Sequence, residues 1–67
     1  METAELIRER RRAKHMTQQN LGELLGYEGR TAEITIQNWE SGRREVPIKK
    51  IRQVAELLDL TFDELIP

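Results

Sequence analysis

Apolar residues recur along the chain at helical spacing, in segments that glycine and proline separate. Leu21, Leu24 and Leu25 lie three and four positions apart, which is the spacing of one helix face. The segment 48–58 carries isoleucine, valine, alanine and leucine in the clearest amphipathic pattern of the chain. The pattern predicts an all-α fold of five helices, at about 4–14, 18–25, 32–41, 47–58 and 62–66.

Residues that favour helix ends stand at the boundaries of these segments. Threonine, whose hydroxyl can cap free backbone N–H groups, precedes four of them, as Thr3, Thr17, Thr31 and Thr61. Thr61 and Glu64 together form a capping-box pattern. Gly26 and Gly42 fit the left-handed position that ends a helix, and Pro47 suits the first turn of the fourth helix.

The apolar faces of the five helices predict one shared core. Its expected members are Leu6, Leu21, Leu25, Ile36, Trp39, Ile51, Val54, Leu58 and Phe62. Arg10 and Arg11 lie at core-like spacings in the first helix, so we expect their aliphatic stems to cover the core. Gly22 lies inside the second helix, where glycine costs about 1 kcal/mol relative to alanine, and it therefore indicates a close helix contact.

Length and composition narrow the class of protein. A chain of 67 residues fits one domain, which we expect to span 1–67. With no cysteine and one histidine, we expect no disulfide, no metal and no cofactor. No apolar run approaches the roughly 20 residues of a membrane helix, and no apolar signal region follows the acidic start. We therefore expect a soluble cytoplasmic protein.

The sequence contains no arrangement typical of catalysis. We find no serine–histidine–aspartate set, paired-carboxylate pocket or phosphate-binding loop. So small a chain also leaves little room for a substrate cavity. We therefore expect no enzyme activity and no small-molecule substrate.

Charge is unevenly distributed along the chain. Eleven Lys and Arg against twelve Asp and Glu give a net charge of −1, whereas a nucleic-acid module is usually basic. The segment 8–14 nevertheless holds five basic residues and one acidic, while 53–67 holds four acidic and no basic. One end of the domain can therefore face phosphate while the other faces away.

The segment 17–41 predicts a helix-turn-helix, because two short helices flank a glycine-containing turn and the second can enter the major groove. Its outward face carries Gln37 and Asn38, whose amides can bind adenine at two points, and Ile34, which can contact a thymine methyl. Glu33 can accept a hydrogen bond from cytosine. The candidate DNA-binding residues, for bases and phosphates together, are Thr17, Gln18, Arg30, Glu33, Ile34, Thr35, Gln37, Asn38, Arg43 and Arg44.

These residues also have plain structural interpretations. The amides of the third helix would, taken alone, be ordinary surface groups, and it is the flanking glutamine and arginines that favour DNA contact. Ile34 could serve a protein contact instead. Trp39 shares a face with apolar neighbours and is interpreted as core. The arginines of 8–12 are more typical of a solvated helix face than of phosphate contacts.

Four motifs and a tail occur together along nearly the whole chain. They are Ile7-Arg8-Glu9-Arg10-Arg11, Met16-Thr17-Gln18, Leu21-Gly22-Glu23-Leu24-Leu25-Gly26 and Ile36-Gln37-Asn38-Trp39-Glu40-Ser41-Gly42, with the tail at 47–48, 54–58 and 62–65. In this combination the chain resembles the phage repressor–Cro (XRE-like) helix-turn-helix family. The resemblance implies a compact five-helix repressor-like domain.

The resemblance also implies roles for individual residues. Gln18 would contact a phosphate, and Arg11 and Glu40 would form a structural ion pair. The implied base-contacting positions are Glu33, Ile34 and Asn38.

The spacing inside the helix-turn-helix departs from the family pattern. Twelve residues separate Gly26 from Trp39, roughly four more than is usual in this family. They could lengthen the turn or add one turn to the recognition helix, since four residues make about one helical turn. We favour a longer turn that uses Gly29. Arg10 also stands where the family usually has an apolar residue.

Two functions compete on this pattern. We expect a sequence-specific, duplex-DNA-binding transcriptional regulator that acts as a repressor at an operator. The alternative is a protein-interaction module on the same fold, such as an antitoxin or a coactivator-like adaptor. The acidic total favours the alternative, whereas the basic and amide groups around the third helix favour DNA.

We expect two copies of the chain on DNA. One recognition helix reads only a few base pairs, so a homodimer on two-fold half-sites, about one helical turn apart, supplies the missing specificity. The candidate contact between the copies is the apolar C-terminal segment with Phe62, Leu65 and Ile66, unless the core uses it.

Overall fold

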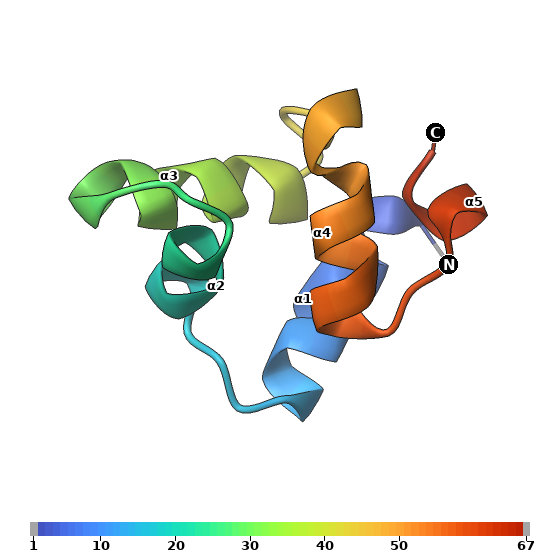
Figure 1. The fold of residues 1–67 in the computed structure, drawn as a ribbon, viewed down its shortest axis with the longest axis horizontal. Helices are drawn as coiled ribbons and strands as arrows, with labels where there is room; N and C mark the ends of the chain where they lie inside the picture. Colours follow the sequence, from blue (N-terminus) through green and yellow to red (C-terminus); the bar gives the residue numbers. More distant parts are fainter. Residues whose placement is uncertain (1, 67) are drawn as a thin grey trace.

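The computed structural model describes residues 2–66, and this part of the chain folds into five helices. They are α1 (Thr3–Ala13), α2 (Gln18–Leu24), α3 (Gly29–Glu40), α4 (Ile48–Leu58) and α5 (Phe62–Leu65). This order confirms the predicted all-α class, and Figure 1 shows α3 running across α2 with α4 beside them. Met1 and Pro67, the ends of the predicted domain, lie outside the described residues.

Two of the predicted helix caps are confirmed. The hydroxyl of Thr17 accepts a hydrogen bond from the backbone N–H of Asn20 at 3.0 Å, and the Asn20 side chain accepts one from the Thr17 N–H at 3.4 Å. The hydroxyl of Thr61 likewise accepts from the Glu64 N–H at 3.2 Å, and the Glu64 carboxylate accepts from the Thr61 N–H at 2.8 Å. Both are capping boxes, which fix where α2 and α5 begin.

The caps predicted at Thr3 and Thr31 are wrong. Thr3 is the first residue of α1, and its hydroxyl donates to the backbone carbonyl of Glu64 at 3.0 Å, so it ties α1 to α5 instead. Thr31 lies inside the first turn of α3, which begins two residues earlier with Glu28 in the N-cap position. Pro47 also falls one position outside its expected place, as the N-cap of α4.

The longer turn predicted between α2 and α3 is also wrong. Gly26 ends α2 with a φ of +99°, as expected, but α3 begins at Gly29 and takes up the extra residues as helix. Tyr27 packs edge-on against Trp39, with ring centroids 6.1 Å apart, and so holds the short turn against the core. Once the chain enters a helix there, each further residue adds a backbone hydrogen bond, so the four residues lengthen α3.

Buried apolar side chains from all five helices and from the connections after α2, α3 and α4 form the core. They are Ile7, Leu21, Leu25, Ile36, Trp39, Val46, Ile51, Val54, Leu58, Leu60 and Leu65. The prediction is confirmed for seven of its nine members; Leu6 is only partly buried and packs against this core, and the prediction is wrong for Phe62, which is 53% exposed. Phe62 is the first residue of α5, and Leu65, three positions later, faces the core in its place. Leu24 and Ile48, predicted on apolar faces, are also exposed.

Gly22 confirms the predicted close contact between helices. A Cβ atom at this position would lie 2.7 Å from the Cα of Ala32 and would overlap the carbonyl of that residue. These are backbone atoms that cannot rotate away, so only glycine lets α2 and α3 approach this closely. The contact sets the packing of the two helices of the helix-turn-helix.

Two arginine side chains of α1 are partly or fully buried, as the sequence indicated. Arg11 is buried, and Arg10 is partly buried with its Nη1 donating to the backbone carbonyl of Asp59 at 3.0 Å. This bond joins α1 to the end of α4. Within residues 2–66, no helix has the length and apolar character needed to cross a membrane.

Candidate nucleic-acid interface

The face of α3 that points away from the core carries polar side chains and one apolar one. Arg30, Gln37 and Ser41 are exposed, and Ile34 is 43% exposed. The opposite face is formed by side chains at 32, 36 and 39, which are at most 3% exposed. Ala32 on that opposite face packs against Gly22 of α2, so the outer side of α3 is the side away from α2. The helix therefore presents a free ridge of the kind that can enter a major groove.

The other predicted base-contacting residues lie at the edges of this ridge. Glu33, Thr35 and Asn38 are partly buried. The side-chain amide of Asn38 makes no hydrogen bond within the described residues, while its backbone carbonyl accepts from Ser41 Oγ at 3.2 Å and from the Arg44 N–H at 3.1 Å. The amide of Asn38 thus remains available, and its main chain is held in place.

The predicted phosphate-binding residues gather at the end of α3, because Gln18 at the start of α2 hydrogen-bonds Glu40, the last residue of α3. Thr17 and Gln18 lie at the start of α2, whereas the exposed Arg43 and Arg44 follow the end of α3. The hydroxyl of Thr17 accepts a hydrogen bond in the α2 cap, and its own O–H can still donate to a phosphate. Gln18 and the two arginines keep free N–H groups for such a contact.

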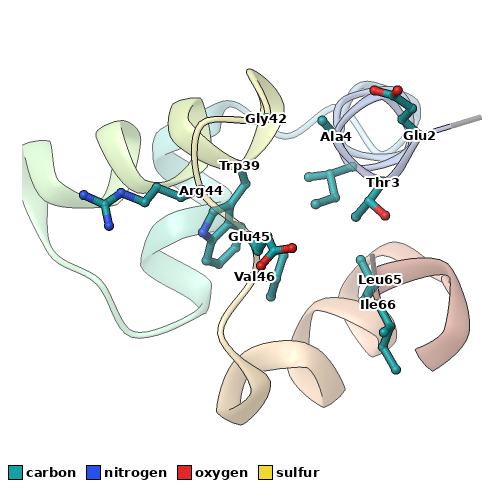
Figure 2. A pocket seen from close by; sticks show the side chains of 11 residues that line it. Glu2, Thr3, Ala4, Trp39, Gly42, Arg44, Glu45, Val46, Leu65 and Ile66 are labelled. Carbon is teal, nitrogen blue, oxygen red and sulfur yellow. The ribbon is translucent and has the colours of Figure 1, made fainter.

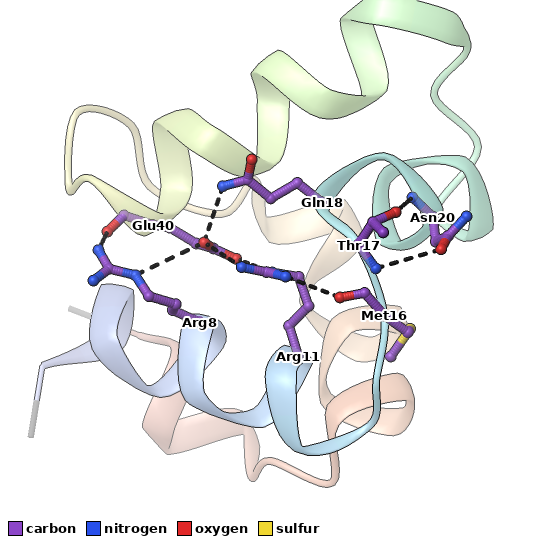
Figure 3. A network of polar contacts seen from close by, with 7 residues as sticks. All are labelled: Arg8, Arg11, Met16, Thr17, Gln18, Asn20 and Glu40. Atoms are coloured by element: carbon purple, nitrogen blue, oxygen red, sulfur yellow. Dashed lines mark hydrogen bonds and ion pairs between the residues drawn. The ribbon is translucent and has the colours of Figure 1, made fainter.

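A buried carboxylate, Glu40, anchors a network beneath this surface (Figure 3). Glu40 is 4% exposed and Arg11 8%, and they form a two-point ion pair, with Arg11 Nε 2.6 Å from Oε2 and Nη2 3.2 Å from Oε1. Arg11 Nη1 also donates to the backbone carbonyl of Met16 at 2.9 Å. The pair therefore links α1, the loop before α2 and the end of α3.

Two further side chains join this network that the sequence analysis did not place there. Gln18 Nε2 donates to Glu40 Oε1 at 3.1 Å, which fixes its amide at the start of α2 and leaves one amide N–H for a phosphate. Arg8 Nη2 donates to the backbone carbonyl of Glu40 at 3.0 Å. The signal for Arg8 was its position three residues before Arg11, which places both on one side of α1.

Lys50 is a positioning residue that the sequence did not reveal. Its Nζ donates to the backbone carbonyl of Leu25 at 2.6 Å and lies 5.2 Å from the centroid of the Tyr27 ring. An ammonium in this place both caps the end of α2 and binds the aromatic face. Lys50 therefore fastens the turn of the helix-turn-helix to α4.

Two carboxyl groups at the other end of the molecule are held in their charged form. The Lys14 ammonium, 2.8 Å from Asp59, hydrogen-bonds to that carboxylate and lowers its pKa. Hydrogen bonds from the backbone and hydroxyl of Thr61 lower the pKa of Glu64. Both carboxylates belong to the acidic segment 53–67 noted in the sequence, and the positive charge of Lys14 offsets part of its negative charge.

A hollow of about 360 Å³ lies between the start of α1, the loop after α3 and α5 (Figure 2). Its walls include the apolar residues Ile7, Trp39, Val46 and Leu65, with Arg44 and Glu45 at the loop side. Among the described residues that line it, none is a histidine, cysteine or serine. Thr3 also lines it, and its hydroxyl donates to the backbone carbonyl of Glu64 at 3.0 Å.

The comparisons with known proteins agree with this geometry. A family model described as helix-turn-helix matches residues 7–65, which includes most of α1 and all of α2 to α5. Among curated proteins and among solved structures, nothing matches the chain significantly. Since the family model covers most of the sequence, the chain belongs to the XRE-like, Cro/C1-type helix-turn-helix family.

Proposed function

We propose that this protein is a cytoplasmic transcriptional repressor that binds a specific operator in duplex DNA. Its family supports DNA binding in transcription regulation as the general function. Residues 1–67 act in this proposal as one DNA-binding domain, without enzyme activity. The observation that carries it is the free outer ridge of α3, which combines an unpaired amide, apolar carbon and a guanidinium at helical spacing.

Phosphate contacts at the end of α3 would position the domain. Gln18 is held by Glu40 beside the free N–H groups at the start of α2, and Arg43 and Arg44 follow Glu40 at the same end of α3. Such contacts give register and orientation, while the ridge beside them reads the bases. This division of roles makes Asn38 a base-reading residue and Arg43 a phosphate-binding one.

Two copies of the domain would occupy the operator as a homodimer on two-fold half-sites. A single ridge reads too few base pairs for a genome-scale target, and a second copy supplies the rest. Of the three C-terminal residues expected at the contact, Leu65 is buried in the core, which leaves Phe62 and Ile66, 53% and 43% exposed.

Selection of duplexes from a random pool tests this function. We expect enriched sequences with inverted or repeated half-sites about one helical turn apart. Asn38→Ala should weaken the enriched duplex by about 1–3 kcal/mol and relax the preference at one base pair. Arg43→Ala, the matched control, should weaken enriched and random duplex alike. A pool without enrichment would overturn the proposal.

A second candidate function, a protein-interaction module such as an antitoxin or adaptor, has one observation in its favour. Ile48 is 84% exposed and Phe62 53%, and both line a hollow along α4 with Arg52 and Glu56. Exposed apolar side chains of this size are typical of a protein contact. If duplex DNA binds only weakly and without sequence preference, this second function replaces the first.

A further inference from the structure

The four extra residues of α3 change which side chains stand at the centre of its outer ridge. Because α3 begins at Gly29, Arg30 lies on the helix and no longer in a turn. At about 100° per residue, Arg30, Ile34 and Gln37 fall within roughly 60° of one another. The direction they share is opposite to the core-facing side chains at 32, 36 and 39. The three form what we call the reading row, Arg30–Ile34–Gln37.

Arg30 has the freedom and the position that a contact with a base needs. It is exposed, forms no ion pair within the described residues, and is the one basic residue in the sequence of α3. The first turn of α3 extends beyond α2 in Figure 1, so no neighbouring helix covers it there. The guanidinium of Arg30 can therefore extend along the major groove, beyond the base pairs that the other side chains of the ridge contact.

The length of the reading row matches a short run of base pairs. A rise of about 1.5 Å per residue places Ile34 roughly 6 Å and Gln37 roughly 10 Å along the helix from Arg30. Successive base pairs are about 3.4 Å apart, so the row spans roughly three of them. Each member also has a distinct partner in the major groove: guanine for arginine, the thymine methyl for isoleucine, and adenine for glutamine.

We infer that Arg30 recognises a guanine, an inference that rests on the proposed DNA-binding function. This guanine lies at one end of the half-site, next to the start of α3. The two parallel N–H groups of Arg30 donate to O6 and N7 of the guanine, a pairing that no other base edge offers. Ile34 and Gln37 read the thymine and the adenine that follow. The extra helical turn therefore adds a base pair to the half-site.

The surrounding charges favour this role over a phosphate contact. Glu28 and Glu33 flank Arg30 along the sequence, and Glu28 is exposed at the N-cap of α3. Two carboxylates repel the phosphate backbone, so a phosphate contact gains little there. A guanine edge, which offers acceptors without a full negative charge, suits an arginine with two glutamates close to it in the sequence better.

The test measures binding of the full chain to the duplex selected by the wild-type protein and to a scrambled duplex. Arg30→Ala should weaken the selected duplex by about 5- to 150-fold, which corresponds to about 1–3 kcal/mol, and change the scrambled one much less. Selection with this variant should lose the preference for guanine at one position. Arg43→Ala is the matched control, since it removes an exposed arginine at the other end of α3 and should weaken both duplexes alike.

Atomic replacement in the DNA identifies the contact itself. Replacing the guanine by 7-deazaguanine removes the N7 acceptor, so it should weaken wild-type binding and leave Arg30→Ala binding unchanged. Circular dichroism of the variant should show an intact helical fold, because alanine favours a helix interior. Equal weakening of selected and scrambled duplexes by Arg30→Ala, or an unchanged guanine preference, would overturn the assignment. If the wild-type protein selects no sequence, the proposed function fails and the assignment fails with it.

Discussion

The buried ion pair between Arg11 and Glu40 offers the sharpest test of how the fold is held. In Glu40→Gln the side chain keeps its shape and loses its charge, which leaves the 8%-exposed guanidinium of Arg11 without a counter-charge. Removing one partner of a buried pair costs about 3–5 kcal/mol. A domain of this length has a total stability of roughly 3–10 kcal/mol, at about 0.05–0.15 kcal/mol per residue. The variant should therefore be close to unfolding at physiological temperature.

Thermal and urea unfolding followed by circular dichroism measures this loss. At about 4–8 °C per kcal/mol for a domain of this size, Glu40→Gln should lower Tm by at least roughly 12 °C. Arg8→Met is the matched control, because the Arg8 side chain is 44% exposed and its Nε lies 3.9 Å from the same carboxylate. It should cost less than about 1 kcal/mol.

A double-mutant cycle with Arg11→Met then isolates the pair itself. The double variant should lose much less stability than the sum of the two single losses, since removing both charges leaves neither uncompensated. Additive losses, or a loss below about 1 kcal/mol for Glu40→Gln, would refute the view that this pair is buried and coupled.

Three other substitutions follow from the contacts of the fold. Gly22→Ala should lower the free energy of unfolding by at least about 1–3 kcal/mol, because the new methyl group overlaps the backbone of Ala32 and this outweighs the better helix propensity of alanine. A variant that is more stable in urea unfolding would contradict this packing. Lys50→Met should cost about 1–3 kcal/mol and weaken selected DNA more than scrambled DNA, whereas the exposed neighbour Lys49→Met should change neither. The charged carboxylate of Glu64, whose pKa is lowered, stabilises the fold at neutral pH, and this stabilisation disappears as pH falls through the lowered pKa. Glu64→Gln should therefore make the free energy of unfolding fall less steeply at acid pH. An unchanged fall would contradict this.

Local signals in the sequence were enough for much of the fold. The capping boxes at Thr17 and Thr61 depend on residues three positions apart, so the sequence shows both halves of each. The apolar spacing identified seven core members in the same way. The close approach at Gly22 was also predictable, because glycine destabilises a helix interior and is favoured there where another backbone packs closely.

Contacts between distant segments decided what the sequence could not show. Gly29 and Thr31 look like a turn and a cap, yet Tyr27 packs on Trp39 and brings the chain into α3 sooner. Thr3 is likewise drawn away from a capping role by a carbonyl 61 positions along the chain.

In the candidate site, too, local sequence patterns predict some features and contacts between distant residues decide the others. The outward positions of Ile34 and Gln37 followed from helical periodicity, whereas Arg30 was expected before the helix and Asn38 is partly buried. The hydrogen bond from Gln18 to Glu40 and the clamp formed by Lys50 join residues 22 and 25 positions apart, and no local pattern predicts such pairs.

The most direct test of sequence-specific DNA binding is the affinity of the wild-type protein for its selected duplex and for a scrambled duplex, measured across a range of salt concentrations. Two arginines, Arg43 and Arg44, in each of two protomers give about four phosphate contacts, so log Kd should change with log salt by a slope of roughly 3 to 4. The selected duplex should bind about 10³-fold more tightly or better at each salt concentration. Equal affinity for the two duplexes, or binding that salt does not weaken, would contradict the account.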